Sequence, residues 1–164
     1  MTDISVRIAG DEADIDAART LCRAWLAWHW QNYPADWRPI GPDHPMAPEK
    51  VEAIIDALPD LHARPRGGKP QGCVMYAEAG PGVAEFNRLF VSEGGRGRGL
   101  GRLMLERMFE QMVLDCYEKV VFSSAKFLTH AKAMYQAAGF VDVPQPEGFP
   151  DELRDYVYFM EREL

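Results

Sequence analysis

Glycine and arginine alternate in one short segment, between residues 94 and 102. The segment holds five glycines and three arginines: Gly94, Gly95, Gly97, Gly99 and Gly101, with Arg96, Arg98 and Arg102. Glycine lets a backbone approach a ligand without a Cβ in the way. Backbone N–H groups at the start of a helix, with guanidinium groups beside them, are typical of a phosphate or pyrophosphate site. The segment therefore predicts that the protein binds a phosphorylated ligand.

Two common nucleotide-binding motifs do not fit this segment. A P-loop requires Gly-Lys-Ser/Thr at the start of the helix, whereas the chain has Gly101-Arg102-Leu103. The dinucleotide motif G-x-G-x-x-G fails as well, because Arg102 stands at the third glycine position counted from Gly97. The alternative without a ligand is a glycine-rich turn that carries surface arginines.

The elements around this segment follow from hydrophobic periodicity and turn residues. Strands are predicted over 4–9, 72–79, 83–92, 119–124, 140–143 and 156–164, and helices over 12–31, 48–58, 100–115 and 128–138. Gly80-Pro81-Gly82 joins two of these strands in a hairpin, and Asp11 is a candidate helix cap. Hairpins mixed with β-α-β crossovers predict an α+β domain of three layers, with helices on the faces of a mixed sheet.

Composition excludes several classes of protein. The chain has 164 residues, of which 47% are apolar, so we expect one folded domain over 1–164. A net charge of −7 argues against a nucleic-acid-binding protein. No apolar run reaches the about 18 residues of a membrane span, and the first residues do not resemble a signal peptide. We therefore expect a cytoplasmic protein that binds no membrane.

Cysteine and histidine offer little chemistry in this sequence. Cys22, Cys73 and Cys116 form no CxxC pair and lie among apolar neighbours, so we interpret them as small core residues. The four histidines lack the spacing of metal ligands, and we expect no metal site.

Two motifs together resemble one family. The stretch Arg96-Gly97-Arg98-Gly99-Leu100-Gly101 is similar to the coenzyme A motif Arg/Gln-x-x-Gly-x-Gly/Ala of the GNAT N-acetyltransferase superfamily. Downstream, the stretch from Ala131 through Tyr135 to Gly139-Phe140 resembles the family's A-x-x-x-Tyr-x-x-x-Gly-Phe signature. The resemblance covers about residues 72–164. It departs from the family at Glu93-Gly94-Gly95, where many members have Pro-x-aromatic, and at Leu128, where many have Asn.

The resemblance implies a GNAT-like α/β/α domain with a mixed, mostly antiparallel central sheet. It also implies an acetyl-CoA-dependent N-acetyltransferase whose acceptor is a primary amine of a small molecule or an amino terminus. The implied cofactor-binding residues are Leu89, Phe90, Val91, Arg96, Gly97, Arg98, Gly99, Leu100, Gly101 and Arg102. Among these, the resemblance assigns backbone groups of the first three to the pantetheine arm, and the Val91 N–H to the thioester carbonyl.

The family's general acid matches Tyr135, for which the alternative is a core tyrosine. We expect Glu85 to be the general base, with Glu78 in reserve and a structural salt bridge as the alternative. Residues 34–48, with Trp37, are our candidate wall for the acceptor. A homodimer is compatible with such a domain. A catalytically weak acyl-CoA-binding sensor, or an enzyme for longer acyl chains, remains the alternative function.

Overall fold

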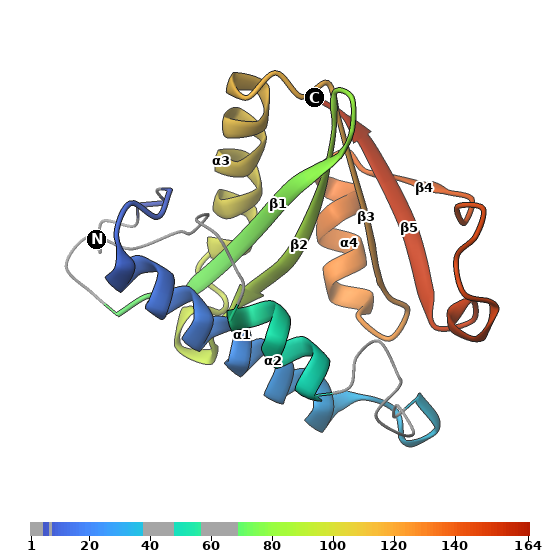
Figure 1. Ribbon diagram of the computed structural model, residues 1–164, viewed down its shortest axis with the longest axis horizontal. Helices are drawn as coiled ribbons and strands as arrows, with labels where there is room; N and C mark the ends of the chain where they lie inside the picture. The colour runs from blue at the N-terminus through green and yellow to red at the C-terminus, as the bar shows by residue number, and fades with distance from the viewer. Residues whose placement is uncertain (1–4, 7, 38–47, 57–68) are drawn as a thin grey trace. The chain divides into compact units, whose positions relative to one another are not determined.

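The computed structural model describes residues 5–6, 8–37, 48–56 and 69–164, and it confirms the α+β class (Figure 1). The helices and strands are, in chain order, α1 (Glu12–Asn32), α2 (Pro48–Asp56), β1 (Gly72–Gly80), β2 (Val83–Val91), α3 (Leu100–Leu114), β3 (Lys119–Ala125), α4 (Thr129–Ala137), β4 (Val141–Val143) and β5 (Val157–Glu163). Short 3-10 turns lie at η1 (Ala35–Trp37), η2 (Glu93–Gly95) and η3 (Asp151–Leu153).

The strands form one mixed sheet in the order β1-β2-β3-β5-β4. β2 and β3 run parallel, whereas β5 is antiparallel to both of its neighbours, β3 and β4. The ladder between β3 and β5 extends from Lys119↔Glu163 to Ala125↔Val157. By contrast, the described ladder between β2 and β3 ends at Glu85↔Val121. The remainder of β2 therefore takes no partner from β3 in this ladder.

The chain forms two compact units, which we describe separately. The first comprises 1–75 and 88–107, and the second comprises 76–87 and 108–164. The chain passes from the second unit back to the first at Arg88, within β2. The φ of Arg88 is 54°, a conformation that few residues other than glycine adopt. A single functional domain over 1–164 stays a prediction.

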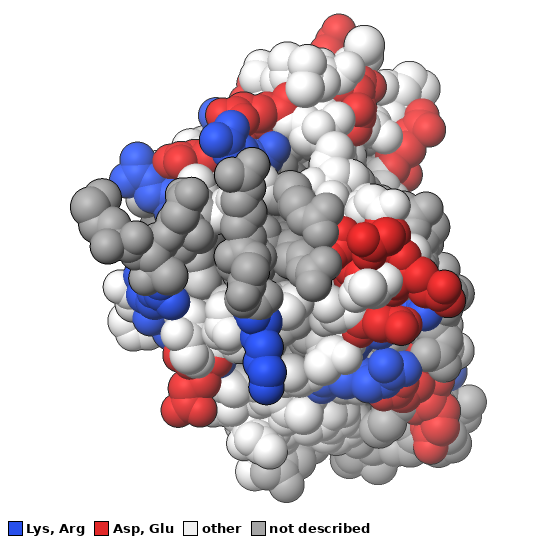
Figure 2. Space-filling view, turned by 90° about the vertical axis from the view of Figure 1, so that its left-hand side faces the viewer, with Lys and Arg blue, Asp and Glu red and all other residues white. Residues whose placement is uncertain are grey.

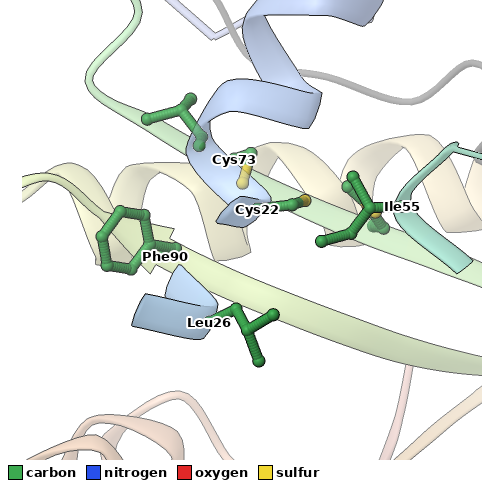
Figure 3. Close-up of a cluster of buried hydrophobic side chains, with 7 residues drawn as sticks. Cys22, Leu26, Ile55, Cys73 and Phe90 are labelled. Carbon is green, nitrogen blue, oxygen red and sulfur yellow. The ribbon is translucent and has the colours of Figure 1, made fainter. Parts of the chain in front are cut away.

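The core of the first unit gathers side chains from α1, α2, β1 and β2 (Figure 3). It contains Leu21, Cys22, Leu26, Ile55, Cys73, Met75 and Phe90, with Trp25, Trp28 and Trp30 packed against it. α1 begins at Glu12 and is capped as predicted by Asp11, whose carboxylate accepts a hydrogen bond from the Asp14 N–H at 2.8 Å. The same helix buries His29, which we had not expected to be in the core.

The core of the second unit is aromatic. Phe122 on β3 lies with its ring centroid 4.3 Å from Phe86 and 5.0 Å from Phe140. Tyr135 on α4 completes the cluster, with its ring 4.5 Å from that of Phe122. Aromatic contacts in edge and tilted geometries therefore hold α4 against β3.

Three expectations from the sequence differ from the structure. The strand predicted over 4–9 is not found at the described residues of that segment, because residues 5, 6, 8 and 9 have no regular secondary structure. Helical spacing of apolar residues over 100–115 predicts a buried stripe formed by Leu100, Leu103, Met104, Met108, Met112 and Val113. Val113 is instead 54% exposed, beside the last residue of α3. Cys116 is exposed, unlike the other two cysteines. Within the described residues, no helix is both long and apolar enough to cross a membrane.

Candidate functional site

The glycine-arginine segment links β2 to α3 through η2 and a turn over 96–99. Gly97 and Gly99 have φ values of 71° and 74°, in the left-handed region that suits glycine. A Cβ added at either position would meet nothing within 4 Å, so the main chain of this turn is open on its outer side. Gly95 serves a different purpose, because an added Cβ there would lie 2.9 Å from Leu100 Cδ1.

Polar contacts hold the base of this turn. The Ser92 N–H donates to the Gln71 carbonyl oxygen at 2.8 Å, and its hydroxyl donates to the Gln71 side-chain oxygen at 2.5 Å. The Arg96 N–H donates to the Glu93 carbonyl oxygen at 3.2 Å, which closes η2. The Gln71–Ser92 contact was not predictable from the sequence, because 21 residues separate the partners and no periodic pattern relates them.

The three arginines of the segment have different surroundings. Arg96 donates from Nε to the Val91 carbonyl oxygen at 3.2 Å, and Arg102 forms an exposed ion pair with Glu106 at 2.8 Å. Arg98 is exposed and has no ion pair or hydrogen bond among the described residues. On the face drawn in Figure 2, outside the grey atoms, basic and acidic side chains are interspersed. Arg98 is therefore the most available source of positive charge for a ligand at this turn.

The start of α3 suits an anion. Its first turn contains no acidic residue, and Leu100 is buried, which fixes the end of the helix. The Leu103 N–H bonds back to the Gly99 carbonyl oxygen at 3.1 Å, so the first intrahelical bond starts in the turn itself. N–H groups before that bond have no intrahelical partner, and the helix dipole adds partial positive charge. An open glycine turn at such a helix end fits a pyrophosphate group.

The end of β2 carries the backbone positions expected to bind the pantetheine arm. Phe90 is buried in the core of the first unit, while Leu89 and Val91 are partly exposed. Arg88 precedes them in its positive-φ conformation, and its carbonyl oxygen accepts a weak hydrogen bond from Cys73 Sγ at 3.7 Å. A residue in this conformation interrupts regular pleating, as in a β-bulge. The sequence did not predict this interruption.

Tyr135 lies in the aromatic core of the second unit, with 5% of its surface exposed. Burial, and to a lesser extent the neighbouring Tyr158, raise the pKa of its hydroxyl above the ordinary value. The phenol therefore keeps its proton near neutral pH and is able to donate it, but it is a poor base. No described residue forms a hydrogen bond with this hydroxyl.

Glu85 is exposed on β2, opposite Val121 of β3. The sequence left open a structural salt bridge for this residue, but it forms no ion pair with any described residue. Asn87, two residues along the same strand, is also exposed, and so is Glu78 on β1. Solvent access is compatible with a proton-accepting role, and the assignment of the base stays a prediction.

Other candidates fall outside the described residues or find no support. Of the expected acceptor wall over 34–48, residues 38–47 lie outside the described part of the chain. Among residues that are described, no three His, Cys, Asp or Glu side chains gather as metal ligands would. Trp28 packs against the core cluster of the first unit, and the Arg96 guanidinium carbon also lies 5.4 Å from its ring centroid.

Comparison with known proteins identifies the class. The model of the acetyltransferase (GNAT) family matches residues 22–140, which is most of the chain. The chain therefore belongs to the GNAT acetyltransferase family, whose members use acetyl-CoA as the acyl donor. Both the resemblance to the GNAT superfamily noted in the sequence and the predicted GNAT-like α+β fold are confirmed.

Individual relatives agree with this class. An uncharacterized N-acetyltransferase from Dictyostelium discoideum is 33% identical over 60 residues, which span 37% of this chain and 28% of that protein's length. A GCN5-related N-acetyltransferase from Kribbella flavida superposes with a TM-score of 0.69 at 22% identity, over 99% of this chain and 98% of that chain. A Bacillus subtilis acetyltransferase solved in complex with CoA gives 0.53 at 15% identity, over 63% and 74% of the two chains.

Proposed function

We propose that the protein transfers an acetyl group from acetyl-CoA to a primary amine, either of a small molecule or of an amino terminus. The observation that carries this proposal is the open glycine turn over 96–99 at the start of α3. Acetyl-CoA supplies both a pyrophosphate, which suits such a turn, and an acetyl group activated as a thioester. Backbone N–H groups of Gly97 to Gly101, with the charge of Arg98, would hold the pyrophosphate.

The strand before the turn would orient the donor. The described ladder with β3 ends at Glu85, so backbone groups of Leu89 to Val91 take no bonds from β3 in this ladder. An extended pantetheine arm fits beside such a strand, because it bonds to main-chain groups as an added strand does. The Val91 N–H would donate to the thioester carbonyl oxygen, where negative charge develops during attack.

Two side chains would move the protons. The amine nitrogen attacks the acetyl carbon, so a C–N bond forms while the C–S bond breaks. Glu85 would accept the proton that the amine loses, and Tyr135 would donate its phenolic proton to the departing sulfur. Support for the second role comes from the raised pKa of Tyr135, which keeps the phenol protonated.

Binding and turnover test the proposal separately. Calorimetry with acetyl-CoA should show saturable binding, and incubation with a panel of primary amines should yield free CoA and an acetylated product by mass spectrometry. Binding without product from any amine would indicate the sensor alternative. Absence of binding would reject both functions.

A further inference from the structure

We propose that Trp28 and Arg96 form a clasp that positions the phosphate-binding turn, and that the Arg96 side chain is not itself a phosphate ligand. This inference rests on the proposed function only for its ligand, because the contacts themselves lie within the first unit. The term clasp refers below to the Trp28 ring, the Arg96 side chain and the Val91 carbonyl group.

The Arg96 side chain is engaged on two sides. Its Nε–H donates to the Val91 carbonyl oxygen at 3.2 Å, at the end of β2. Its guanidinium carbon lies 5.4 Å from the centroid of the Trp28 ring, within the range of a cation–π contact. Both contacts direct the charge back toward the strand end and α1. A fork-shaped guanidinium is suited to bond a carbonyl group and stack on a ring at once.

Trp28 is itself anchored. It packs against the buried cluster of the first unit, and its ring centroid lies 5.3 Å from that of the buried His29. The ring therefore links the core to the turn through Arg96. The peptide that follows Val91 is fixed from both ends, because the Ser92 N–H bonds to the Gln71 carbonyl oxygen at 2.8 Å while Arg96 bonds the Val91 carbonyl oxygen.

This arrangement divides the work among the arginines. Arg96 holds the turn in place, Arg102 is paired with Glu106, and Arg98 is left for the ligand. A positioning residue and a ligand-binding residue differ in one measurable respect. Loss of a direct phosphate contact lowers the salt dependence of binding strongly, whereas loss of a positioning contact lowers it only by the screened long-range effect of the charge removed.

Hydrogen exchange of the ligand-free protein tests the clasp without reference to CoA. Trp28→Leu and Arg96→Gln should each speed exchange of the amides of 92–99 by about two- to fivefold, because an exposed cation–π contact has that strength. Trp28→Phe keeps an aromatic face and should restore most of the protection. Trp25→Leu is the matched control, since Trp25 packs on the same core but contacts the His29 ring and not Arg96. Unchanged exchange in Trp28→Leu would overturn the clasp, as would an equal effect of Trp25→Leu.

Titration with CoA at low and high salt tests the division of work. Arg98→Gln should weaken binding and flatten its salt dependence. Arg96→Gln and Trp28→Leu should weaken binding by about two- to fivefold at both salt concentrations, and the double variant should be no weaker than the worse single variant. A loss of salt dependence in Arg96→Gln as large as the loss in Arg98→Gln would make Arg96 a phosphate ligand and overturn the inference. If wild-type protein bound no CoA, the proposed function would fail while the exchange result would still decide the clasp.

Discussion

The turn over 96–99 and the surroundings of Tyr135 are held in place by different forces. In the first unit, the turn depends on main-chain conformation and on polar bonds to its base from Gln71 and Arg96. In the second unit, Tyr135 is held by the rings of Phe86, Phe122 and Phe140. A site built from main chain, such as the turn, tolerates side-chain changes except at glycine. The position of Tyr135, by contrast, depends on each of the rings that contact it.

The difference also separates two properties that mutation can measure. Around Tyr135, the rings contribute to folding, while the proposed chemistry needs only the hydroxyl. At the turn, the same backbone atoms determine the conformation and, in the proposed function, would bind the ligand. Substitutions in the second unit should therefore be able to change activity without changing stability. Substitutions at the turn in the first unit should change both together.

The largest effect is expected from Phe122→Ala. Phe122 is 3% exposed and contacts the other rings of the cluster, so its removal should lower the free energy of unfolding by about 3–5 kcal/mol. Urea denaturation measures this loss. Phe149→Ala is a control in the same unit, because Phe149 is only partly buried and its ring contact is with Phe159. Equal losses in the two variants would contradict a central role for Phe122.

Tyr135→Phe should separate chemistry from folding. The ring remains, so the free energy of unfolding should change by less than about 1 kcal/mol. Turnover should fall by about 100-fold or more, as expected for loss of a general acid, with little change in CoA affinity. Steady-state kinetics and calorimetry measure these quantities, and Tyr117→Phe provides the control. Undiminished turnover would remove Tyr135 from the mechanism.

Gly99→Ala should affect stability and binding together. An L-residue at a φ of 74° costs roughly 1–2 kcal/mol, and the same strain should distort the turn and weaken CoA binding. Gly80→Ala is a suitable control, because Gly80 also has open space around it but no positive φ. Weaker stability with unchanged CoA affinity would argue that the turn does not hold the ligand.

The smallest effects concern the dependence of stability on pH. A fall in pH should lower stability through His29 in the first unit, and a rise in pH should lower it through Tyr135 in the second. Burial lowers the pKa of His29, partly offset by the hydrogen bond to the Trp25 carbonyl oxygen, whereas burial raises the pKa of Tyr135. Below about pH 6.5, His29 of the unfolded chain becomes protonated while buried His29 of the folded protein stays neutral. Stability should therefore decline as pH falls. Above about pH 10 the unfolded chain loses a proton that folded Tyr135 keeps, so stability should decline as pH rises.

Urea denaturation across pH checks both effects. His29→Gln should reduce the decline on the acid side, and Tyr135→Phe should reduce the decline on the alkaline side. Persistence of either decline in its variant would assign that pH dependence to another group.

Local signals in the sequence predicted most of the fold. The Asp11 cap and the Gly80-Pro81-Gly82 hairpin act within a few residues, and both appear as expected. Of the apolar stripe that helical spacing predicts for α3, four residues are buried, namely Leu100, Met104, Met108 and Met112, whereas Leu103 is partly buried and Val113 is exposed. The alternation over 4–9 did not predict the structure of the described residues of that segment, because alternation shows only that a segment is suited to a sheet. A strand also requires a neighbour with free bonding groups, and the sequence does not reveal one.

The candidate site was predictable to the same extent. Glycine and arginine made the turn visible, since their function depends on local conformation and charge. The contact of Trp28 with Arg96 and the positive φ of Arg88 depend on tertiary packing across distant parts of the chain. Burial of His29 was hidden for the same reason, because a polar residue on a helix gives no apolar periodicity.

Cys116, just beyond α3, has a practical consequence for experiments. It is exposed, whereas Cys22 and Cys73 are buried, and the hydrogen bond with Cys22 together with burial raises the pKa of Cys73. An alkylating reagent added to the folded protein should therefore modify Cys116 first, which offers an attachment point for a fluorophore or spin label. The same thiol would add a background to colorimetric detection of released CoA. Cys116→Asn would remove that background because it removes the thiol. Asparagine is a suitable replacement, since it tolerates the φ of 66° at this position.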